Sequence, residues 1–332
     1  MRCISVIVAV LTLTVGALSA QKTAAPASGF APVSAGEIQK LPYGDFEHWL
    51  TRIIKESVIV GGEEREVYAI ADEGVVKGKV PYVNKKSPWA SSNVYAEVWG
   101  VDKVNCNVRP ESRGEGRCAV LHTERISFKA AGMLTMNVVT AGSIYLGTTL
   151  EPIRDMNAAY NCVDMGIPFT QRPKNLVLDY AAFVGNTGKV IHATGRKVRE
   201  YEGKDPGIIM VHLQQRWEKD GRVYAKRIAT GEFLVRQSSD WRNQIRVPLV
   251  YGKPANEASL SEFSKLNSIF HTRNSEGKSV PIEEVGWAEN TSDKGVQTPV
   301  THLILFISSG TQGAYKGEEG NWLKIDNVGL EY

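Results

Sequence analysis

Alternating hydrophobic and polar positions dominate the chain and predict mostly antiparallel β-structure. The clearest alternation runs over residues 209–214, and Asp220-Gly221 follows it after a polar stretch. Asp-Gly accepts the positive φ angles of a two-residue type I′ turn, so it predicts a long hairpin closed by residues 222–235. β-Rich composition predicts further strands at Met133–Leu146, Thr301–Ser308 and Trp322–Tyr332.

Three shorter segments carry weaker signals. Gly61-Gly62 predicts a hairpin between residues 58–60 and 66–71. Near-helical spacing of apolar residues predicts a short helix over 45–55. A second helix is predicted near Ser259, because Glu262 stands three residues later and Phe263 and Phe270 continue an apolar side. This helix lies within an insertion between strands, over about residues 255–297.

The 332 residues divide into a leader, a tether and a folded part. Residues 1–20 have a positive start, an apolar core and small residues at the end, which is typical of a signal peptide. Residues 21–40 are rich in Ala, Pro, Ser and Gly and predict a flexible tether. The length of 41–332 allows two domains, but the absence of an internal linker favours one large β-sandwich with a small helical insertion.

The leader predicts an exported protein, located in the periplasm, on the outer surface or in the medium. Gln21 rather than a cysteine stands directly after the small residues of the cleavage region, so a lipoprotein is not expected. The apolar run is shorter than the ~20 residues that a spanning helix needs, and no comparable run occurs later. We therefore expect no transmembrane segment after cleavage. The sequence does not indicate an oligomeric state.

Composition and charge narrow the range of possible function classes. The chain has 42% hydrophobic and 23% charged residues, as in an ordinary globular protein. Loss of Arg2 with the leader leaves 38 basic against 36 acidic residues, a net charge of +2. This near-neutral balance argues against a nucleic-acid-binding protein.

Export also changes the interpretation of the cysteines. Cys3 leaves with the leader, so Cys106, Cys118 and Cys162 remain. Cys106 and Cys118 flank a polar, Gly-rich turn, and a disulfide between them would close a short loop and stabilise by about 3 kcal/mol. Two reduced thiols are the alternative. The sequence contains no Cys-x-x-Cys motif, so a zinc site is not expected.

Catalytic motifs are absent from the sequence. It contains no zinc-protease motif, nucleophile elbow, phosphate-binding loop or dinucleotide-binding loop. The histidines are scattered, and we interpret them as sheet residues. Paired carboxylates would serve glycoside hydrolysis. However, the sequence does not select a pair among the eight candidates, Glu97, Glu111, Glu151, Asp155, Asp164, Asp179, Glu283 and Glu284.

Aromatic residues provide the best candidates for ligand contact. Seven tryptophans offer flat rings that suit sugar faces, although core packing is the alternative for each of them. Trp89 is singled out because Pro88–Asn93 is predicted to be a loop. Arg172 and Tyr180 lie close to the rigid Pro173 and would hydrogen-bond hydroxyls and stack on a sugar. Their alternative is a structural role, with Arg172 paired to an acid and Tyr180 packed in a strand.

Four segments together resemble the putative carbohydrate metabolism domain of exported Bacteroidetes proteins. The most specific are the Pro-Phe-Thr-x-Arg-Pro stretch and the terminal Ile-Asp-Asn-Val strand. The resemblance implies a jelly-roll-like antiparallel β-sandwich and a role with glycans, often labelled glycoside hydrolase, but it supplies no catalytic pair. The segments are Phe46–Trp49, Pro88–Asn93, Gly166–Pro173 and Leu323–Tyr332.

The same pattern resembles jelly-roll carbohydrate-binding modules of the galactose-binding type. In these, an early Phe-Glu and a terminal Ile-Asp lie on adjacent strands and hold calcium. The resemblance implies a structural calcium ion at Glu47 and Asp326, with backbone carbonyls completing the shell. Two surface acids are the alternative.

Two function classes follow. The first is an exported protein that acts on or binds a polysaccharide, as a glycoside hydrolase. The second is a non-catalytic carbohydrate-binding or envelope module. Facing carboxylates in an aromatic-lined cleft would favour the enzyme, whereas an aromatic platform without such a pair would favour binding.

Overall fold

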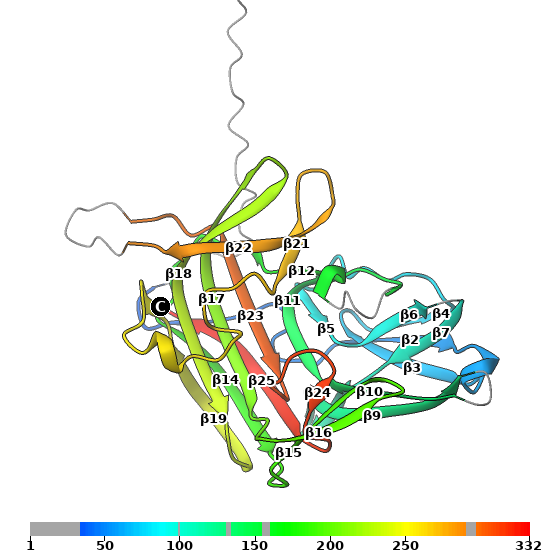
Figure 1. The fold of residues 1–332 in the computed structure, drawn as a ribbon. Coiled ribbons are helices and arrows are strands. Elements are labelled where there is room, and N and C mark those ends of the chain that lie inside the picture. The colour runs from blue at the N-terminus through cyan, green and yellow to red at the C-terminus, as the bar shows by residue number, and fades with distance from the viewer. Residues whose placement is uncertain (1–33, 99, 131–133, 155–159, 290–296) are drawn as a thin grey trace, which may run out of the picture.

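The computed structural model describes residues 34–98, 100–130, 134–154, 160–289 and 297–332. Figure 1 shows two large curled sheets facing each other, with two small sheets beside one end of the pair. Pairing is antiparallel throughout the large sheets except between β18 and β22. The predicted all-β, antiparallel sandwich is confirmed.

The first large sheet has ten strands, and its main path runs β16-β15-β10-β9-β25-β14-β19. β1, β8 and β24 pair beside this path. The bounds are β1 Ile38–Lys40, β8 Val108–Arg113, β9 Gly116–Ala130, β10 Leu134–Ala141, β14 Asn175–Phe183, β15 Lys189–Gly195, β16 Val198–Glu202, β19 Ser239–Pro248, β24 Lys316–Gly317 and β25 Trp322–Glu331.

The second large sheet also has ten strands, in the path β12-β11-β23-β17-β18-β22-β21, with β5, β13 and β20 beside it. The bounds are β5 Trp89–Ser91, β11 Ser143–Thr149, β12 Val163–Met165, β13 Ile167–Pro168, β17 Gly207–Lys219, β18 Arg222–Val235, β20 Val250–Tyr251, β21 His271–Arg273, β22 Ser279–Trp287 and β23 His302–Ser308.

The small sheets contain β3-β2-β4 and β6-β7. Their bounds are β2 Trp49–Lys55, β3 Glu64–Ile70, β4 Gly74–Lys77, β6 Val94–Val98 and β7 Val101–Asn105. Helical elements in the described part of the chain are short 3₁₀ turns, including η1 Val58–Val60 and η3 Glu257–Ser259.

The main core lies between the two large sheets. It is built from the inward positions of alternating strands, so Leu178 and Ile325 of the first sheet meet Val211 and Leu305 of the second. The second sheet is buried on its other face as well, where Phe263 and Phe270 pack on the ring of Phe306. One large sandwich therefore accounts for both ten-stranded sheets.

The long hairpin and two of the predicted strands appear as expected. Asp220 and Gly221 have φ angles of 53° and 73° and connect β17 to β18. Residues 301–308 and 322–332 form β23 and β25. The predicted strand at 133–146 is two strands, because Gly142 separates β10 from β11. A Cβ at Gly142 would lie 2.6 Å from the backbone nitrogen of His122, so this crossing requires glycine.

The predicted helical insertion at 255–297 is wrong in the described part of that segment, which continues to residue 289. It contains the turn η3 and the strands β21 and β22. After η3, Leu260 is extended, and the backbone and hydroxyl of Ser261 donate to the carboxylate of Glu232. Phe263 and Phe270 bury themselves on the sheet face. Tertiary contacts of the apolar side chains outweigh the local helix signal.

The amino-terminal part of the fold also differs from expectation. Residues 49–55 of the predicted helix form β2, which pairs with β3. The predicted hairpin arm at 58–60 is therefore wrong, because these residues form the turn η1 and the strand that pairs with β3 lies before them. β-Branched Thr51, Ile53 and Ile54 favour the strand. The predicted tether over 21–40 ends earlier than expected, since β1 pairs with the end of β25. The leader and residues 21–33 lie outside the described residues.

Asp205 is fully buried, and we expect its carboxylate to make the stability of the fold depend on pH. Its carboxylate accepts backbone N–H bonds from Thr311 at 2.7 Å and Glu318 at 3.0 Å, and so fixes the chain on both sides of β24. Burial raises its pKa to about 6. An acid whose pKa is raised on folding binds a proton more readily in the folded state, so its contribution to stability falls as pH rises.

We expect the stability of the parent relative to Asp205→Asn to be greatest below about pH 4. It should decrease by about 3 kcal/mol as pH rises to 7, which is the raised pKa expressed as free energy. Urea unfolding of both proteins from pH 4 to 7 measures this difference. A constant difference between parent and variant across that range would contradict the assignment.

Candidate functional site

The outer face of the first sheet gathers charged and aromatic side chains. On β14 and β25, every second residue points away from the core, which places Asp179 and Phe183 on the same face as Trp322, Lys324 and Asp326. The cross-strand register sets Asp179 against Asp326 and Phe183 against Trp322. Residues distant in sequence therefore meet on one surface.

Arg113, at the end of β8, connects the two aspartates. Its Nη1 donates to Oδ2 of Asp179 at 2.8 Å and to Oδ2 of Asp326 at 2.5 Å. Its Nη2 donates to Oδ1 of Asn243 at 2.7 Å. The side-chain Nδ2 of Asn327 also donates to Oδ2 of Asp179, at 2.9 Å. We call Arg113, Asp179, Asn243, Asp326 and Asn327 the polar cluster.

Backbone irregularities shape the polar cluster. β14 has register shifts against both of its neighbours around Asp179. Opposite it, Gln244 and Asn327 have left-handed φ angles of 49° and 51°. The backbone N–H of Gln244 then donates to Asp179 at 2.7 Å, and the backbone N–H of Asn327 donates to Asp326 at 2.7 Å. Such conformations in non-glycine residues concentrate at functional sites.

The two aspartates differ in their pKa shifts. Burial disfavours the charged form of Asp179, but its bonds from Gln244, Asn327 and Arg113 outweigh burial and lower its pKa. Burial raises the pKa of Asp326 and exceeds the opposing effect of Arg113. The cluster therefore holds a firmly ionised carboxylate beside one that takes up a proton more readily.

Aromatic rings border the polar cluster. The Arg113 guanidinium lies 3.8 Å from the centre of the Trp241 ring, which is half-buried on β19. Further along the face, Phe183 and Trp322 stack with centroids 6.3 Å apart, and Lys324 lies 5.0 Å from the Trp322 ring. Asp179 and Phe183 are four residues apart on one strand, about 13 Å. The result is an elongated surface with rings at both ends.

The three predicted ligand-contact residues lie elsewhere, in structural positions. Trp89 is 1% exposed, donates from Nε1 to the Pro42 carbonyl and packs against Phe46. Tyr180 is buried in the core beside Phe233. Arg172 lies 4.5 Å from the Tyr251 ring and donates to the Thr298 carbonyl. The structure does not bring these side chains together.

The predicted calcium ligands have other partners. Glu47 accepts the backbone N–H of Arg117 at 3.1 Å on both carboxylate oxygens, and Asp326 contacts the guanidinium of Arg113. The described residues contain no group of three His, Cys, Asp or Glu side chains arranged to hold a metal. Arg113 therefore supplies the positive charge between Asp326 and Asp179 in this structure.

The predicted disulfide is not formed, since Cys106 and Cys118 are both free thiols. In the β8–β9 pair, Cys118 lies opposite Glu111, five positions beyond Cys106 on the partner segment. That offset corresponds to about 16 Å along the strand. A disulfide requires Cα atoms about 4.4 to 6.8 Å apart. The turn between them is a β-hairpin, as expected, but its register separates the thiols.

The other candidate carboxylates are held individually rather than in pairs. Each described member contacts a basic or hydroxyl side chain, and Asp155 lies outside the described residues. The contacts are Glu97 with Arg154, Glu111 with Lys324, Glu151 with Arg52, Asp164 with Thr272, Glu283 with Arg222 and Glu284 with Arg227. Asp179, in contrast, shares its basic partner Arg113 with a second acid, Asp326.

Sequence reasoning identified Asp326, listed Asp179 among the candidate carboxylates and counted Trp241 only as one of seven tryptophans, but it did not connect the three. It missed Arg113, which it interpreted as part of a polar turn. The signal available was the Ile-Asp-Asn-Val end of the chain, where two polar residues interrupt a strand that is otherwise apolar on its inner side. The partners of that interruption depend on strand order, which local pattern does not give.

No helix in the described part of the chain is long and apolar enough to cross a membrane.

Among curated proteins, no match was found. The chain is similar to a putative glycoside hydrolase from Bacteroides vulgatus ATCC 8482, with 14% identity, a TM-score of 0.40, and 89% of this chain and 95% of that chain covered.

A second similar structure is a putative glycoside hydrolase from Bacteroides thetaiotaomicron VPI-5482. It has 15% identity and a TM-score of 0.41, and the match covers 82% of this chain and 76% of that chain. The family model described as "Putative carbohydrate metabolism domain" matches residues 45–331, nearly the whole described fold. The chain therefore belongs to the putative carbohydrate metabolism domain family.

Proposed function

We propose that the protein is a non-catalytic carbohydrate-binding protein, and that the outer face of β25, β14 and β19 contacts the glycan. The observation that carries this proposal is the position of Trp241 beside the polar cluster. Aromatic rings pack on the apolar faces of sugars, while planar carboxylate, amide and guanidinium groups hydrogen-bond neighbouring hydroxyls. The family's relation to carbohydrate metabolism supports the same ligand class.

Rigidity also favours binding at this face. The polar cluster is fixed by backbone amides of Gln244 and Asn327 and lies on strands rather than on loops. A pre-organised surface loses little conformational entropy when a ligand binds. Asn243 and Asn327 are exposed beside the buried carboxylates. Their side chains are therefore accessible to the hydroxyl groups of a bound glycan.

The arrangement of the acids favours binding over hydrolysis. Glycosidases place an acid and a base or nucleophile on opposite sides of the scissile bond, about 5 to 9.5 Å apart. Asp179 and Asp326 both lie within 2.8 Å of the same nitrogen of Arg113, so a guanidinium occupies the space where a glycosidic bond would stand. This matches a platform whose charges orient a ligand rather than transfer protons.

A glycan array followed by calorimetric titration of the strongest ligand tests the proposal. We expect saturable binding, and Trp241→Ala should weaken it by about thirtyfold, the effect of a residue worth about 2 kcal/mol. Trp217→Ala is the matched control, because Trp217 is 38% exposed but lies near the tip of the β17–β18 hairpin in the other sheet. Its affinity should equal that of the parent.

Product analysis of every bound glycan separates the two function classes. Binding without new reducing ends supports the proposal, whereas turnover by the parent that Asp179→Asn abolishes would replace it with hydrolysis. No binding to any glycan, or equal losses in Trp241→Ala and Trp217→Ala, would overturn the assigned face.

We also propose that the protein is exported, because residues 1–20 have the charge and apolar pattern of a cleaved leader. An uncharged partner such as a neutral polysaccharide suits the near-neutral chain. Amino-terminal sequencing of protein recovered from cell fractions tests this, with Gln21 expected as the first residue. Retention of Met1 on cytoplasmic protein would contradict it.

A further inference from the structure

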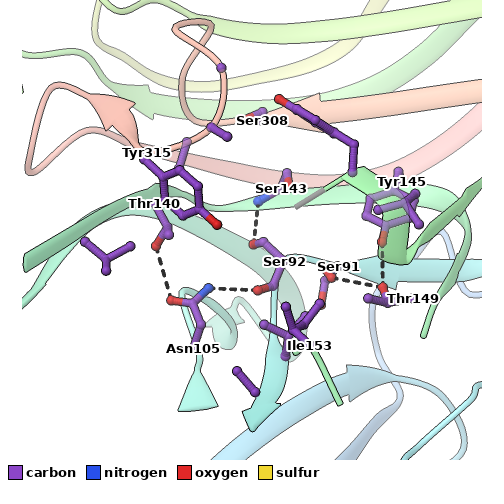
Figure 2. Close-up of a pocket in the computed structure, with 18 of the residues that line it drawn as sticks. Ser91, Ser92, Asn105, Thr140, Ser143, Tyr145, Thr149, Ile153, Ser308 and Tyr315 are labelled. Atoms are coloured by element: carbon purple, nitrogen blue, oxygen red, sulfur yellow. Dashed lines mark hydrogen bonds between the residues drawn. The ribbon is translucent and has the colours of Figure 1, made fainter. Parts of the chain in front are cut away.

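A cavity of about 350 Å³ lies away from the proposed glycan face, against the outer side of the second sheet. Figure 2 shows Tyr145 and Tyr315 on two of its sides, with Ser92 between them and Asn105 below Tyr315. Its walls come from the second sheet, the small β6–β7 sheet, the β9–β10 hairpin and the loop before β24. The size falls within the range of about 300 to 1,000 Å³ typical of small-molecule sites.

The walls are mostly apolar. Phe263, Phe270 and Phe306 pack together on one side, and Val94, Ala96 and Val98 of β6 line another side. Because alternate residues of a strand share a face, these three β6 residues present one continuous apolar edge to the cavity. A ligand that covers this surface gains about 25 cal/mol for each Å² of apolar area removed from water.

The polar groups of the cavity bond mainly to one another. Asn105 donates to the Ser92 carbonyl at 2.7 Å and accepts from Thr140 at 3.1 Å, as the dashed lines in Figure 2 mark. The hydroxyl groups of Tyr145 and Thr149 share a bond of 2.5 Å. A ligand therefore meets a wall whose donors and acceptors are already engaged, which favours few polar groups on the ligand.

Charge in the cavity is similarly compensated. Lys103 is the one charged side chain among the described lining residues, and its ammonium contacts the buried carboxylate of Glu56 at 2.7 Å. A free sugar would leave many hydroxyls without partners in such a site, at a cost for each. A strongly anionic or cationic ligand would find no counter-charge there.

We propose that this cavity is a second binding site, which takes a compact, uncharged and largely apolar small molecule. Aromatic rings on the ligand suit the phenylalanine cluster, and the engaged polar groups of Ser92, Asn105 and Thr140 favour a ligand with few polar groups of its own. The site is independent of glycan binding at the outer face of the first sheet, since the two share no residue.

Fluorescence titration with N-phenyl-1-naphthylamine, a neutral two-ring probe, tests the site. We expect saturable binding of one probe per chain, with no change in oligomeric state. Ala96→Trp should fill the cavity and weaken probe binding at least tenfold. Glu97→Trp is the matched control, because the neighbouring side chain points to the opposite face of β6, and it should bind as the parent does.

Thermal unfolding and near-ultraviolet circular dichroism verify that each variant is folded. If Ala96→Trp is not folded, Val98→Trp gives the same test from the last residue of β6. Trp241→Ala should bind the probe like the parent, so failure of the glycan proposal leaves this readout unchanged. Non-saturable fluorescence, or a folded cavity-filled variant that binds within twofold of the parent, would overturn the proposal.

Discussion

Replacing Glu284 with glutamine is expected to lower the free energy of unfolding by about 3 to 5 kcal/mol. Glu284 and Arg227 form an ion pair whose side chains are 3% and 0% exposed. Glu284 Oε1 also accepts from Gln214 at 2.6 Å, and Arg227 donates to the Ser264 carbonyl at 3.0 Å. The variant leaves the buried guanidinium without its counter-charge.

The neighbouring residue provides the control. Glu283 pairs with Arg222 at 2.7 Å, but Arg222 is 61% exposed, so water compensates for loss of the partner. Glu283→Gln should cost less than about 1 kcal/mol. Urea unfolding followed by tryptophan fluorescence gives both values. If the two variants lose equal stability, the Arg227–Glu284 pair is not isolated from solvent.

This ion pair also connects stability to the second binding site. Arg227 and Glu284 hold the segment that follows η3, through the Ser264 carbonyl and the Asn267 amide. That segment carries Phe263, which lines the cavity. Weaker probe binding in Glu284→Gln would therefore accompany loosening of this segment, without any direct contact between Glu284 and the probe.

Local pattern predicted the parts of the fold that local physics determines. The β17–β18 hairpin follows from Asp220-Gly221 and from alternation on both sides, and β25 follows from its apolar inner positions. The segment near Ser259 has helical spacing, yet Glu232 binds Ser261 and the sheet buries Phe263. Those contacts depend on residues nearby in space but distant in sequence, so local spacing alone misplaced the helix.

The candidate site was predictable only in part, for the same reason. Asp326 was identified because a terminal Ile-Asp strand resembles carbohydrate-binding modules. Its partner in the structure is Arg113, which the pairing of β8 with β9 and of β9 with β25 places near Asp326. Trp89 appeared exposed from its loop-like segment, but pairing of β5 with β11 places it in the core. Strand order decides both outcomes, and no short motif encodes it.

Replacing Arg113 with methionine should also cost about 3 to 5 kcal/mol at neutral pH. The side chains of Asp179 and Asp326 are 7% and 8% exposed, and both contact the same guanidinium nitrogen. Without it, two nearly buried carboxylates face each other with no positive partner. Arg117→Met is the matched control, because Arg117 and its partner Glu73 are 45% and 64% exposed. That loss should stay below about 1 kcal/mol.

Acidification should reduce the penalty of Arg113→Met. Arg113 helps to lower the pKa of Asp179, so its stabilising contribution is present above the ordinary carboxyl pKa of about 4 and is lost as pH falls below it. The stabilities of parent and variant should therefore converge toward pH 3 to 4 in urea titrations. Adding Asp179→Asn and Asp326→Asn to the variant should recover stability at pH 7, since both stranded charges are then removed. A penalty that persists at low pH and in the triple variant would show that Arg113 acts by packing on Trp241 rather than by charge.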